Sequence, residues 1–297
     1  MPILFALVGA TGVGKSRLSL ELAERFNAEI IGVDSRQIYK GFAIGTAQPS
    51  FQDMARVKHH LVDFLDPGLT FSAGDFCANV RKLLAENQNQ NYILVGGTGL
   101  YLQSLMLGLP QIPKIEESVR KSFEDDAAKF GSKSLYEKAR VVDPEAMEKV
   151  EVNNVQRVIR ILEVFKLTGR KLSDWQKERV GGIGYVPVFW LNRSRENLYA
   201  RIDARVDQMM ADGWLEEIHE LAKNVPIEAP AWQSLGYREL LCAKDGNQVQ
   251  VVLDEVKRKT RNYAKRQLTW FRWQVKSIEM DLDTCANPVE FVLKQLD

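Results

Sequence analysis

The chain has 297 residues, 45% of them hydrophobic, which is enough to bury the core of one large domain or of one domain with an insertion. Its 40 basic and 39 acidic residues leave a net charge of +1, so the overall charge favours no class of partner. Three widely spaced cysteines indicate structural thiols in a reducing compartment. No apolar run approaches the roughly 18 residues of a membrane span, and we expect a soluble, cytoplasmic protein without a membrane partner.

An apolar run at residues 3–8 predicts a buried strand that leads directly into a glycine-rich stretch. This stretch reads Gly-x4-Gly-Lys-Ser, the phosphate-binding loop pattern, which is also typical of nucleotide- and ATP-binding proteins, and a helical pattern follows it. Successive N–H groups of such a loop surround phosphate oxygens, and the helix N-terminus attracts the same negative charge. Lys15 adds a mobile positive charge, and the Ser16 hydroxyl can bind Mg²⁺. A di- or triphosphate is therefore expected on the phosphate loop, which consists of Gly9, Ala10, Thr11, Gly12, Val13, Gly14, Lys15 and Ser16.

Residues 28–35 predict a second short buried strand with Asp34 at its carboxyl end. In open α/β sheets, ligands bind beyond the carboxyl ends of the strands, so the topology places Asp34 near the phosphate loop. The alternative is that Asp34 caps the next helical turn. Another short strand is expected at residues 59–64. Its adjacent His59 and His60 would point to opposite faces, and we interpret them as structural residues rather than metal ligands.

A helix is predicted from the capping box at residues 72–75 to about Asn87. The next buried strand, residues 92–95, ends in the glycine-rich turn at 96–99. ATPases and GTPases usually carry an acidic residue at this strand end, where it holds Mg²⁺ and helps to position water. No acidic residue stands there, which argues against simple hydrolysis of a nucleoside triphosphate.

A charged, helix-rich segment runs from about residue 114 to residue 179, and no strand is expected within it. Apolar residues recur at helical spacing over residues 155–165, and Gly169 provides the C-terminal end of that helix. The strand pattern returns at residues 185–191. A long helix is then predicted from about residue 195 to residue 223.

The strongest charge asymmetry lies in residues 257–276, which hold eight basic residues and no acidic residue. Basic groups neutralise phosphates, and aromatic planes stack on unpaired bases, so this basic run predicts a polyanionic partner. The alternative is a solvated helix face, although like charges one turn apart repel. The aromatic residues interleaved with these charges are Tyr263, Trp270, Phe271 and Trp273.

Together these patterns predict an α/β fold: a P-loop-type parallel sheet flanked by helices, with a helical insertion domain. Residues 1–112 and 181–297 would form the catalytic core, with the basic run in its C-terminal helices. Residues 113–180 would form the insertion.

Several stretches in combination resemble the tRNA dimethylallyltransferases, also called tRNA isopentenyltransferases, in their bacterial short form. Each of the later motifs is weak alone, but the ordered set extends from residue 9 to residue 272 and is highly specific. No Cys/His zinc module follows the basic run. The motifs occupy residues 9–16, 34–39, 44–47, 59–63, 96–101, 154–164, 205–209, 233–239 and 260–272.

The resemblance implies transfer of the dimethylallyl group from dimethylallyl diphosphate to N6 of adenosine 37, beside the tRNA anticodon. This is a prenyltransferase reaction of class EC 2.5.1, and it is a tRNA modification that releases diphosphate. The phosphate loop would bind the diphosphate together with Mg²⁺, and no nucleoside triphosphate would be consumed. The expected partners are therefore the tRNA anticodon stem-loop and dimethylallyl diphosphate, and we expect a monomer.

The resemblance also implies roles for single residues. Asp34 would be the general base that accepts the N6 proton, and Arg205 would stabilise the departing diphosphate. The implied catalytic residues are Lys15, Ser16, Asp34, Thr98 and Arg205, with Ser16 as the Mg²⁺ ligand. The implied tRNA-binding residues are Asp34, Ser35, Arg36, Gln37, Thr98, Leu100, Arg120, Gln156, Arg157, Arg160, Lys265 and Arg266.

The chain departs from the family pattern at Ala43 and Gln48, where relatives often carry an acid and a base, and at Ala10, where proline is frequent. Three other interpretations remain. An adenylate isopentenyltransferase acting on free nucleotide would give the insertion and the basic run little purpose. A P-loop small-molecule kinase or ATPase would lack the usual acid at its strand end. An RNA-binding module without catalysis would leave Lys15 and Asp34 unexplained.

Overall fold

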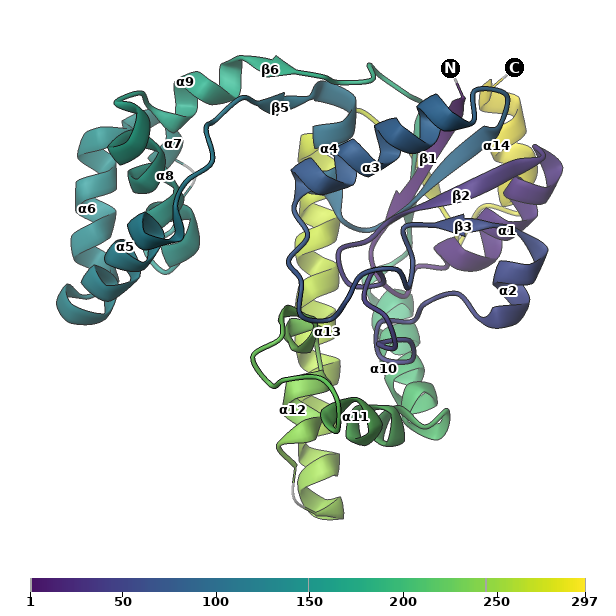
Figure 1. Cartoon of the computed structure of the whole chain (residues 1–297). Coiled ribbons are helices and arrows are strands. Elements are labelled where there is room, and N and C mark those ends of the chain that lie inside the picture. Colours follow the sequence, from purple (N-terminus) through teal and green to yellow (C-terminus); the bar gives the residue numbers. More distant parts are fainter. Residues whose placement is uncertain (1, 149, 244, 297) are drawn as a thin grey trace. The chain divides into compact units, whose positions relative to one another are not determined.

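The computed structural model describes residues 2–148, 150–243 and 245–296, and the chain divides into two compact units. Unit 1 comprises Met1–Gln103 and Tyr185–Asp297, and unit 2 comprises Ser104–Gly184 (Figure 1). Unit 2 is therefore longer at both ends than the insertion predicted at residues 113–180. The reason lies in two short antiparallel strands, β5 (Leu109–Pro110) and β6 (Arg179–Val180), which pair with each other inside unit 2. No strand was predicted from about residue 114 to residue 179, where β6 begins.

Unit 1 is built on a parallel sheet of six strands in the order β3-β2-β4-β1-β7-β8. The central strands read as nearly continuous apolar runs because parallel sheets are covered on both faces. This architecture confirms the predicted α/β fold. The strands are β1 (Ile3–Gly9), β2 (Ala28–Val33), β3 (His59–His60), β4 (Asn91–Gly96), β7 (Val188–Asn192) and β8 (Ile278–Asp281).

The carboxyl ends of the three central strands meet at one edge of this sheet. Val8 on β1 and Val33 on β2 both pair with Gly96 on β4, so the three strands end side by side. The chain leaves β1 into the phosphate loop, β2 into Asp34, and β4 into the turn that contains Thr98. The register of the sheet therefore brings the phosphate loop, Asp34 and the turn with Thr98 to the same edge of the sheet.

Helices of unit 1 cover the sheet and extend beyond it (Figure 1). The capping box predicted at Ser72 and Asp75 is present and begins α3. The long basic helix α13 contributes Ala264 and the partly buried Leu268 to the core around the sheet. The helices are α1 (Lys15–Arg25), α2 (Phe51–Arg56), α3 (Ala73–Glu86), α4 (Gly99–Leu107, counted with unit 2 from Ser104 on), α10 (Arg195–Ala211), α11 (Trp214–Ala222), η1 (Pro230–Gln233), α12 (Tyr237–Leu241), α13 (Gly246–Gln274) and α14 (Pro288–Leu296).

Two predicted elements were wrong in their extent. The strand expected at residues 59–64 ends at His60, because Leu61 and Asp63 have positive φ angles of 59° and 50°, which no strand tolerates. The helix expected from residue 195 to residue 223 is divided into α10 and α11. Gly213 interrupts it in the left-handed conformation with φ of 93°. A glycine inside a helical pattern is the sequence signal for such a break.

Unit 2 is a bundle of short helices around its own apolar core. As predicted, α8 carries the apolar residues of 155–165 and ends at Gly169, which has φ of 67°. The buried carboxylate of Asp143 accepts hydrogen bonds from Ser173 N, Ser173 Oγ and Ala146 N. The helices are α5 (Glu117–Phe130), α6 (Ser132–Val142), α7 (Pro144–Met147), α8 (Val155–Thr168) and α9 (Leu172–Lys177).

Neither a membrane span nor a ready-made metal cluster is found in the described residues. None of the helices described is both long and apolar enough to cross a membrane. In the same residues, no group of three or more His, Cys, Asp or Glu side chains is arranged to hold a metal ion. His60 instead pairs with Glu29 at 2.5 Å, and His59 Nδ1 lies 2.7 Å from the carbonyl oxygen of Val57.

Candidate active site

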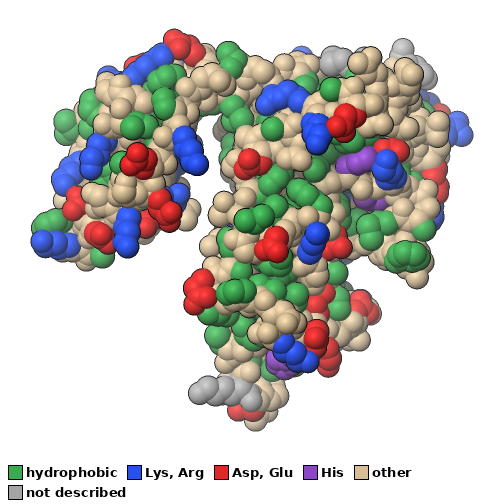
Figure 2. Space-filling view, viewed as in Figure 1, with side chains coloured by type: hydrophobic (Ala, Val, Ile, Leu, Met, Phe, Trp, Pro, Cys, Tyr) green, Lys and Arg blue, Asp and Glu red, His purple; other side chains and the backbone are tan. Residues whose placement is uncertain are grey.

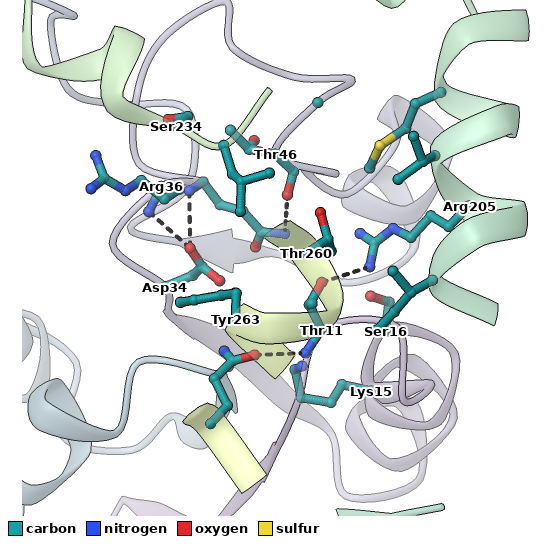
Figure 3. Close-up of a pocket in the computed structure, with 18 of the residues that line it drawn as sticks. Thr11, Lys15, Ser16, Asp34, Arg36, Thr46, Arg205, Ser234, Thr260 and Tyr263 are labelled. Atoms are coloured by element: carbon teal, nitrogen blue, oxygen red, sulfur yellow. Dashed lines mark hydrogen bonds between the residues drawn. The ribbon is translucent and has the colours of Figure 1, made fainter. Parts of the chain in front are cut away.

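A cavity of about 150 Å³ opens at the carboxyl edge of the sheet in unit 1. Figure 3 shows the phosphate loop at one side of this cavity, Asp34 and Arg36 at another, and Arg205 entering from α10. Thr260 and Tyr263 of α13 complete the wall. Residues far apart in the sequence therefore line one space.

The phosphate loop carries its lysine close to its own backbone. Lys15 Nζ donates hydrogen bonds to the carbonyl oxygens of Gly9 (2.9 Å) and Ala10 (3.0 Å). Desolvation by the surrounding protein lowers the pKa of Lys15 to about 8, with nearby Asp34 opposing this shift and Arg205 adding to it. A phosphate group entering the cavity would find this ammonium group within the loop.

Three arginines from α10 and the segment before it hold the outer side of the phosphate loop. Arg193 Nε donates to the carbonyl oxygen of Val13, and Arg201 Nε donates to that of Gly12, both at 2.9 Å. Arg205 Nη1 donates to the hydroxyl oxygen of Thr11 at 3.3 Å. Burial lowers the pKa of Arg205, which Asp34 opposes, and the guanidinium remains a cation at neutral pH. Of these three arginines, Arg205 is the one among the described residues that lines the cavity, and Arg193 pairs with Asp283 at 2.6 Å.

The two carboxylate oxygens of Asp34 differ in their hydrogen bonds. Its Oδ1 accepts hydrogen bonds from the backbone N–H groups of Arg36 (2.8 Å) and Gln37 (3.3 Å). The alternative that Asp34 caps the following turn is thus correct for this oxygen. Among the described residues, Oδ2 has no hydrogen-bond partner, and Figure 3 shows the carboxylate in the cavity wall beside Tyr263. Burial and the negative charge of Asp34 raise the pKa of Tyr263 to about 12, so its hydroxyl stays protonated.

Thr98 forms hydrogen bonds with the backbone on both sides of Asp34. Its hydroxyl oxygen accepts a hydrogen bond from Ser35 N at 3.0 Å, and its own N–H donates to the carbonyl oxygen of Val33. Thr98 is not among the described residues that line the cavity. The structure therefore gives Thr98 a positioning contact with the backbone next to Asp34.

A buried network fixes the loop at residues 43–48. Glu217 Oε2 accepts hydrogen bonds from the N–H groups of Ala43 (3.0 Å) and Ile44 (2.8 Å). Tyr237 donates from its hydroxyl to Glu217 Oε1 at 2.6 Å, and burial together with Glu217 raises the pKa of this tyrosine. The loop that closes one side of the cavity is thus held by α11 and α12.

The unusual Gln48 also has a structural role in this loop. Its Nε2 donates to the carbonyl oxygens of Gln37 (2.9 Å) and Tyr39 (2.8 Å). An amide N–H group therefore ties the loop to the segment that follows Asp34. Ala43 takes part in the loop through its backbone, whose N–H donates to Glu217 and whose carbonyl oxygen accepts from Gln48 N.

One part of the cavity wall is apolar. These side chains come from α10, α11, α13 and the segment before α12, and they share the cavity with Lys15 and Arg205. The arrangement suits a ligand with an anionic head and a small apolar tail. The apolar wall consists of Ile202, Val206, Met209, Trp214, Leu235 and Val256.

Comparison with known proteins shows which family this chain resembles in sequence. The sequence profile of the family described as IPP transferase matches residues 37–274, which excludes the phosphate loop but covers most of the chain. The chain is 42% identical over 278 residues to the tRNA dimethylallyltransferase of Geobacter metallireducens, covering 91% of this chain and 89% of that protein. It is 40% identical over 294 residues to the tRNA dimethylallyltransferase of Bacillus subtilis, covering 97% and 93%.

The chain belongs to the IPP transferase family. Solved structures agree with this membership. The full-length tRNA isopentenylpyrophosphate transferase of Bacillus halodurans aligns with a TM-score of 0.71 and 35% identity, covering 100% of this chain and 97% of that one. A eukaryotic dimethylallyltransferase, described as acting on tRNA, aligns with a TM-score of 0.80 and 27% identity, covering 99% and 78%.

The fold of this IPP transferase brings together only part of the predicted site. Ser35 and Arg266 line a second hollow of unit 1. This hollow shares Arg36, Ser234, Leu235 and Tyr263 with the cavity. Lys265 and the 57% exposed Leu100 lie on the surface. The predicted residues that line the cavity itself are Thr11, Lys15, Ser16, Asp34, Arg36, Gln37 and Arg205.

The predicted tRNA-binding residues of unit 2 lie on exposed helix surfaces. Gln156 and Arg157 are exposed in the first turn of α8. Arg160 is exposed as well but pairs with the buried carboxylate of Glu163 at 2.8 Å. Arg120 on α5 pairs with Glu124 at 3.1 Å. These two arginines therefore already have anionic partners within the protein.

The basic run carries less free positive charge than its sequence predicts. The run itself holds no acidic residue, but acids from other helices pair with it: Arg261 pairs with Asp203 at 2.6 Å, and Lys259 pairs with Glu239 at 3.0 Å. Figure 2 shows Asp and Glu side chains among the Lys and Arg side chains on the visible face of unit 1. Among the described residues, Lys265 and other charges in the second half of the run have no ion pair.

Four further residues of the site escaped the sequence analysis. Ser234 and Tyr237 lie within the motif at 233–239, and Gln267 lies within the motif at 260–272, but no role was given to any of them. Glu217 stands in an ordinary amphipathic helix, where no sequence signal distinguishes it.

Gly45 lies close to the buried side chain of Trp214. A Cβ atom at this position would overlap the indole ring of Trp214, which is 1% exposed. We expect Gly45→Ala to destabilise unit 1 by about 1–3 kcal/mol, because the buried ring has little room to move. Thermal unfolding measures this loss. Gly246→Ala is the control, because a Cβ there would meet nothing within 4 Å, and an equal effect of the two substitutions would contradict the prediction.

Proposed function

We propose that this protein transfers the dimethylallyl group from dimethylallyl diphosphate to N6 of adenosine 37 in tRNA and releases diphosphate. The observation that carries the proposal is one cavity with a cationic phosphate loop, an apolar wall and the free carboxylate oxygen of Asp34. The names of the relatives support the reaction, and the eukaryotic neighbour is described as acting on tRNA.

On the donor side, the phosphate loop binds the diphosphate group. Lys15 exchanges its contacts with the loop carbonyls for diphosphate oxygens, and Arg205 adds a second cation. As the bond between the allylic carbon and the bridging oxygen breaks, negative charge grows on the departing diphosphate. Preorganised donors aimed at this charge lower the barrier. The apolar wall surrounds the five-carbon group and excludes water that would otherwise compete with the adenine.

On the acceptor side, the exocyclic N6 of the adenine attacks the allylic carbon. Its proton becomes acidic as the new C–N bond forms, so a base within hydrogen-bond reach is required. Oδ2 of Asp34 accepts this proton, while Oδ1 continues to hold the turn at Arg36 and Gln37. The base must leave its stack to enter the cavity, at a cost of a few kcal/mol that RNA contacts elsewhere offset.

The donor set also suits Mg²⁺, which binds in proteins through few oxygen ligands together with substrate phosphates. The Ser16 hydroxyl lines the cavity at the start of α1, and Asp34 lies in the same wall. We infer that Ser16 holds the ion beside the diphosphate. The ion would neutralise part of the charge on the leaving group.

For the tRNA, we infer contacts by Lys265 and Arg266 on α13 and by Ser35 to Gln37 at the mouth of the cavity. Leu100, Thr98 and the unit 2 residues Arg120, Gln156, Arg157 and Arg160 remain proposed contacts with the anticodon stem-loop. We further infer a monomer that works in the cytoplasm, where tRNA and dimethylallyl diphosphate meet.

A labelling experiment tests the function. Incubation with labelled dimethylallyl diphosphate, Mg²⁺ and unmodified tRNA should transfer the label to tRNA at adenosine 37. Labelling of free AMP but not tRNA would instead support an adenylate isopentenyltransferase. Transfer of phosphate from ATP to a small molecule, without any prenyl transfer, would support a kinase.

The salt dependence of tRNA affinity tests the RNA-binding surface. Each lost phosphate contact should reduce the slope of log affinity against log salt concentration by about one unit, so Lys265→Ala and Arg266→Ala should each flatten it. Lys259→Ala is the matched control, because Glu239 and Glu255 already neutralise this residue of the same helix. Equal slopes for all three variants and the wild type would show that this part of α13 does not face RNA.

A further inference from the structure

Gln267 of α13 forms a hydrogen-bonded bridge between two strand ends. The side chain is 6% exposed; its Oε1 accepts from Thr11 N at 2.9 Å, and its Nε2 donates to the carbonyl oxygen of Gly97 at 3.0 Å. A backbone N–H can only donate and a carbonyl can only accept, so these partners fix the orientation of the amide. Among natural side chains of this length, only glutamine supplies both groups without a charge.

The bridge is also tightly packed. A Cβ atom at Gly97 would overlap Nε2 of Gln267, so the close approach requires glycine there. Both partners are backbone groups of loops that follow strands of the sheet, β1 and β4. The side chain therefore fixes the separation of two loops, in addition to filling space.

Each of these loops holds one half of the proposed reaction centre. The hydroxyl of Thr11 accepts a hydrogen bond from Arg205, which belongs to the donor side. Thr98 accepts one from the backbone N–H that follows Asp34, which belongs to the acceptor side. Gln267 thus lies between the diphosphate-binding loop and the segment that carries the general base.

We propose that Gln267 is a positioning residue for prenyl transfer, which sets the phosphate loop and Arg205 in register with Asp34. This inference rests on the proposed function and adds a residue to it. Without the bridge, the N–H of Thr11 and the carbonyl of Gly97 lose their partner, and the two loops can shift relative to each other. A displacement of about 1 Å in a reacting group costs on the order of 10²-fold in rate.

The test begins with Gln267→Met, which preserves length and volume but removes both hydrogen bonds. We expect kcat for tRNA prenylation to fall about 10- to 100-fold, with the Kd for tRNA changed less than about twofold. Affinity for inorganic diphosphate with Mg²⁺ should fall as well, because the loop amides lose their alignment. Gln250→Met, a substitution of an exposed residue near the start of the same helix, is the control and should match the wild type.

Gln267→Glu gives a readout that a packing role would not produce. The ionised carboxylate can still accept from Thr11 N but repels the carbonyl oxygen of Gly97, whereas the protonated acid can donate to that carbonyl. Burial raises the pKa of a carboxyl group toward neutrality. The activity of this variant relative to wild type should therefore rise at least several-fold as the pH falls from about 8 to 6.

Three outcomes would overturn the proposal: wild-type kcat in Gln267→Met, a loss confined to tRNA affinity, or a pH-independent ratio for Gln267→Glu. If Gln267→Met does not fold, Gly97→Ala decides, because the added Cβ would displace Nε2 of Gln267 from the carbonyl oxygen of Gly97. This variant should also lower kcat, and an unchanged kcat in a folded Gly97→Ala protein would contradict the proposal. Failure of the wild-type protein to prenylate tRNA would refute the proposed function instead, while the measurement with diphosphate alone would still report on the bridge.

Discussion

Replacement of Asp34 by asparagine should lower the rate of tRNA prenylation by about 10²- to 10⁴-fold, because the variant lacks the base that accepts the N6 proton. Asparagine is the informative substitution here. Its side-chain oxygen can still accept from the N–H groups of Arg36 and Gln37, so the turn that follows β2 is preserved. The loss should appear in kcat, measured by single-turnover transfer of label from dimethylallyl diphosphate.

Affinity for tRNA separates a catalytic role of Asp34 from a binding role. A base that acts on charge developing in the transition state contributes little to the ground-state complex. We therefore expect the Kd of Asp34→Asn for tRNA to stay within about threefold of wild type, while Asp34→Ala also loses the turn and some stability. Equal losses in tRNA affinity and rate for Asp34→Asn would identify Asp34 as a binding residue.

The order of buried runs and turns in the sequence was sufficient to predict much of this fold. A strand that leads into Gly-x4-Gly-Lys-Ser and a helix leaves little choice of topology, since parallel strands place their carboxyl ends together. That rule alone predicted that Asp34 lies near the phosphate loop. Where the prediction was wrong in extent, as at Leu61 and Gly213, single backbone conformations ended an element that the apolar pattern would have continued.

The contacts between residues of the site could not be predicted from the sequence, because each depends on packing between segments that are far apart in the chain. Gln267 meets Thr11 across 256 positions of the chain, and Glu217 meets Ala43 across 174. The same reason explains the error over the basic run. Its counter-charges, such as Asp203, stand on other helices and are invisible to an inspection of one segment. Charge patterning along a single helix therefore overstated the free positive charge of α13.

Lys15 should be the largest single contributor to diphosphate binding. Lys15→Met keeps the length of the side chain but removes its charge, and we expect kcat/KM for dimethylallyl diphosphate to fall about 10²- to 10³-fold, as for the loss of one preorganised donor. Steady-state kinetics with saturating tRNA measures this loss. Arg201→Met is the control, because Arg201 also holds the loop, through the carbonyl of Gly12, but does not line the cavity.

The pH dependence of binding identifies the ammonium group itself. In the ligand-free protein, desolvation lowers the pKa of Lys15 to about 8, so the side chain is charged below this pH and increasingly neutral above it. A bound diphosphate favours the charged form, and binding above pH 8 must therefore take up a proton. The affinity of wild type relative to Lys15→Met should be greatest near pH 7 and should decline through pH 9. The ratio cancels the titration of the ligand, and a constant ratio over this range would show that Lys15 does not carry the binding charge.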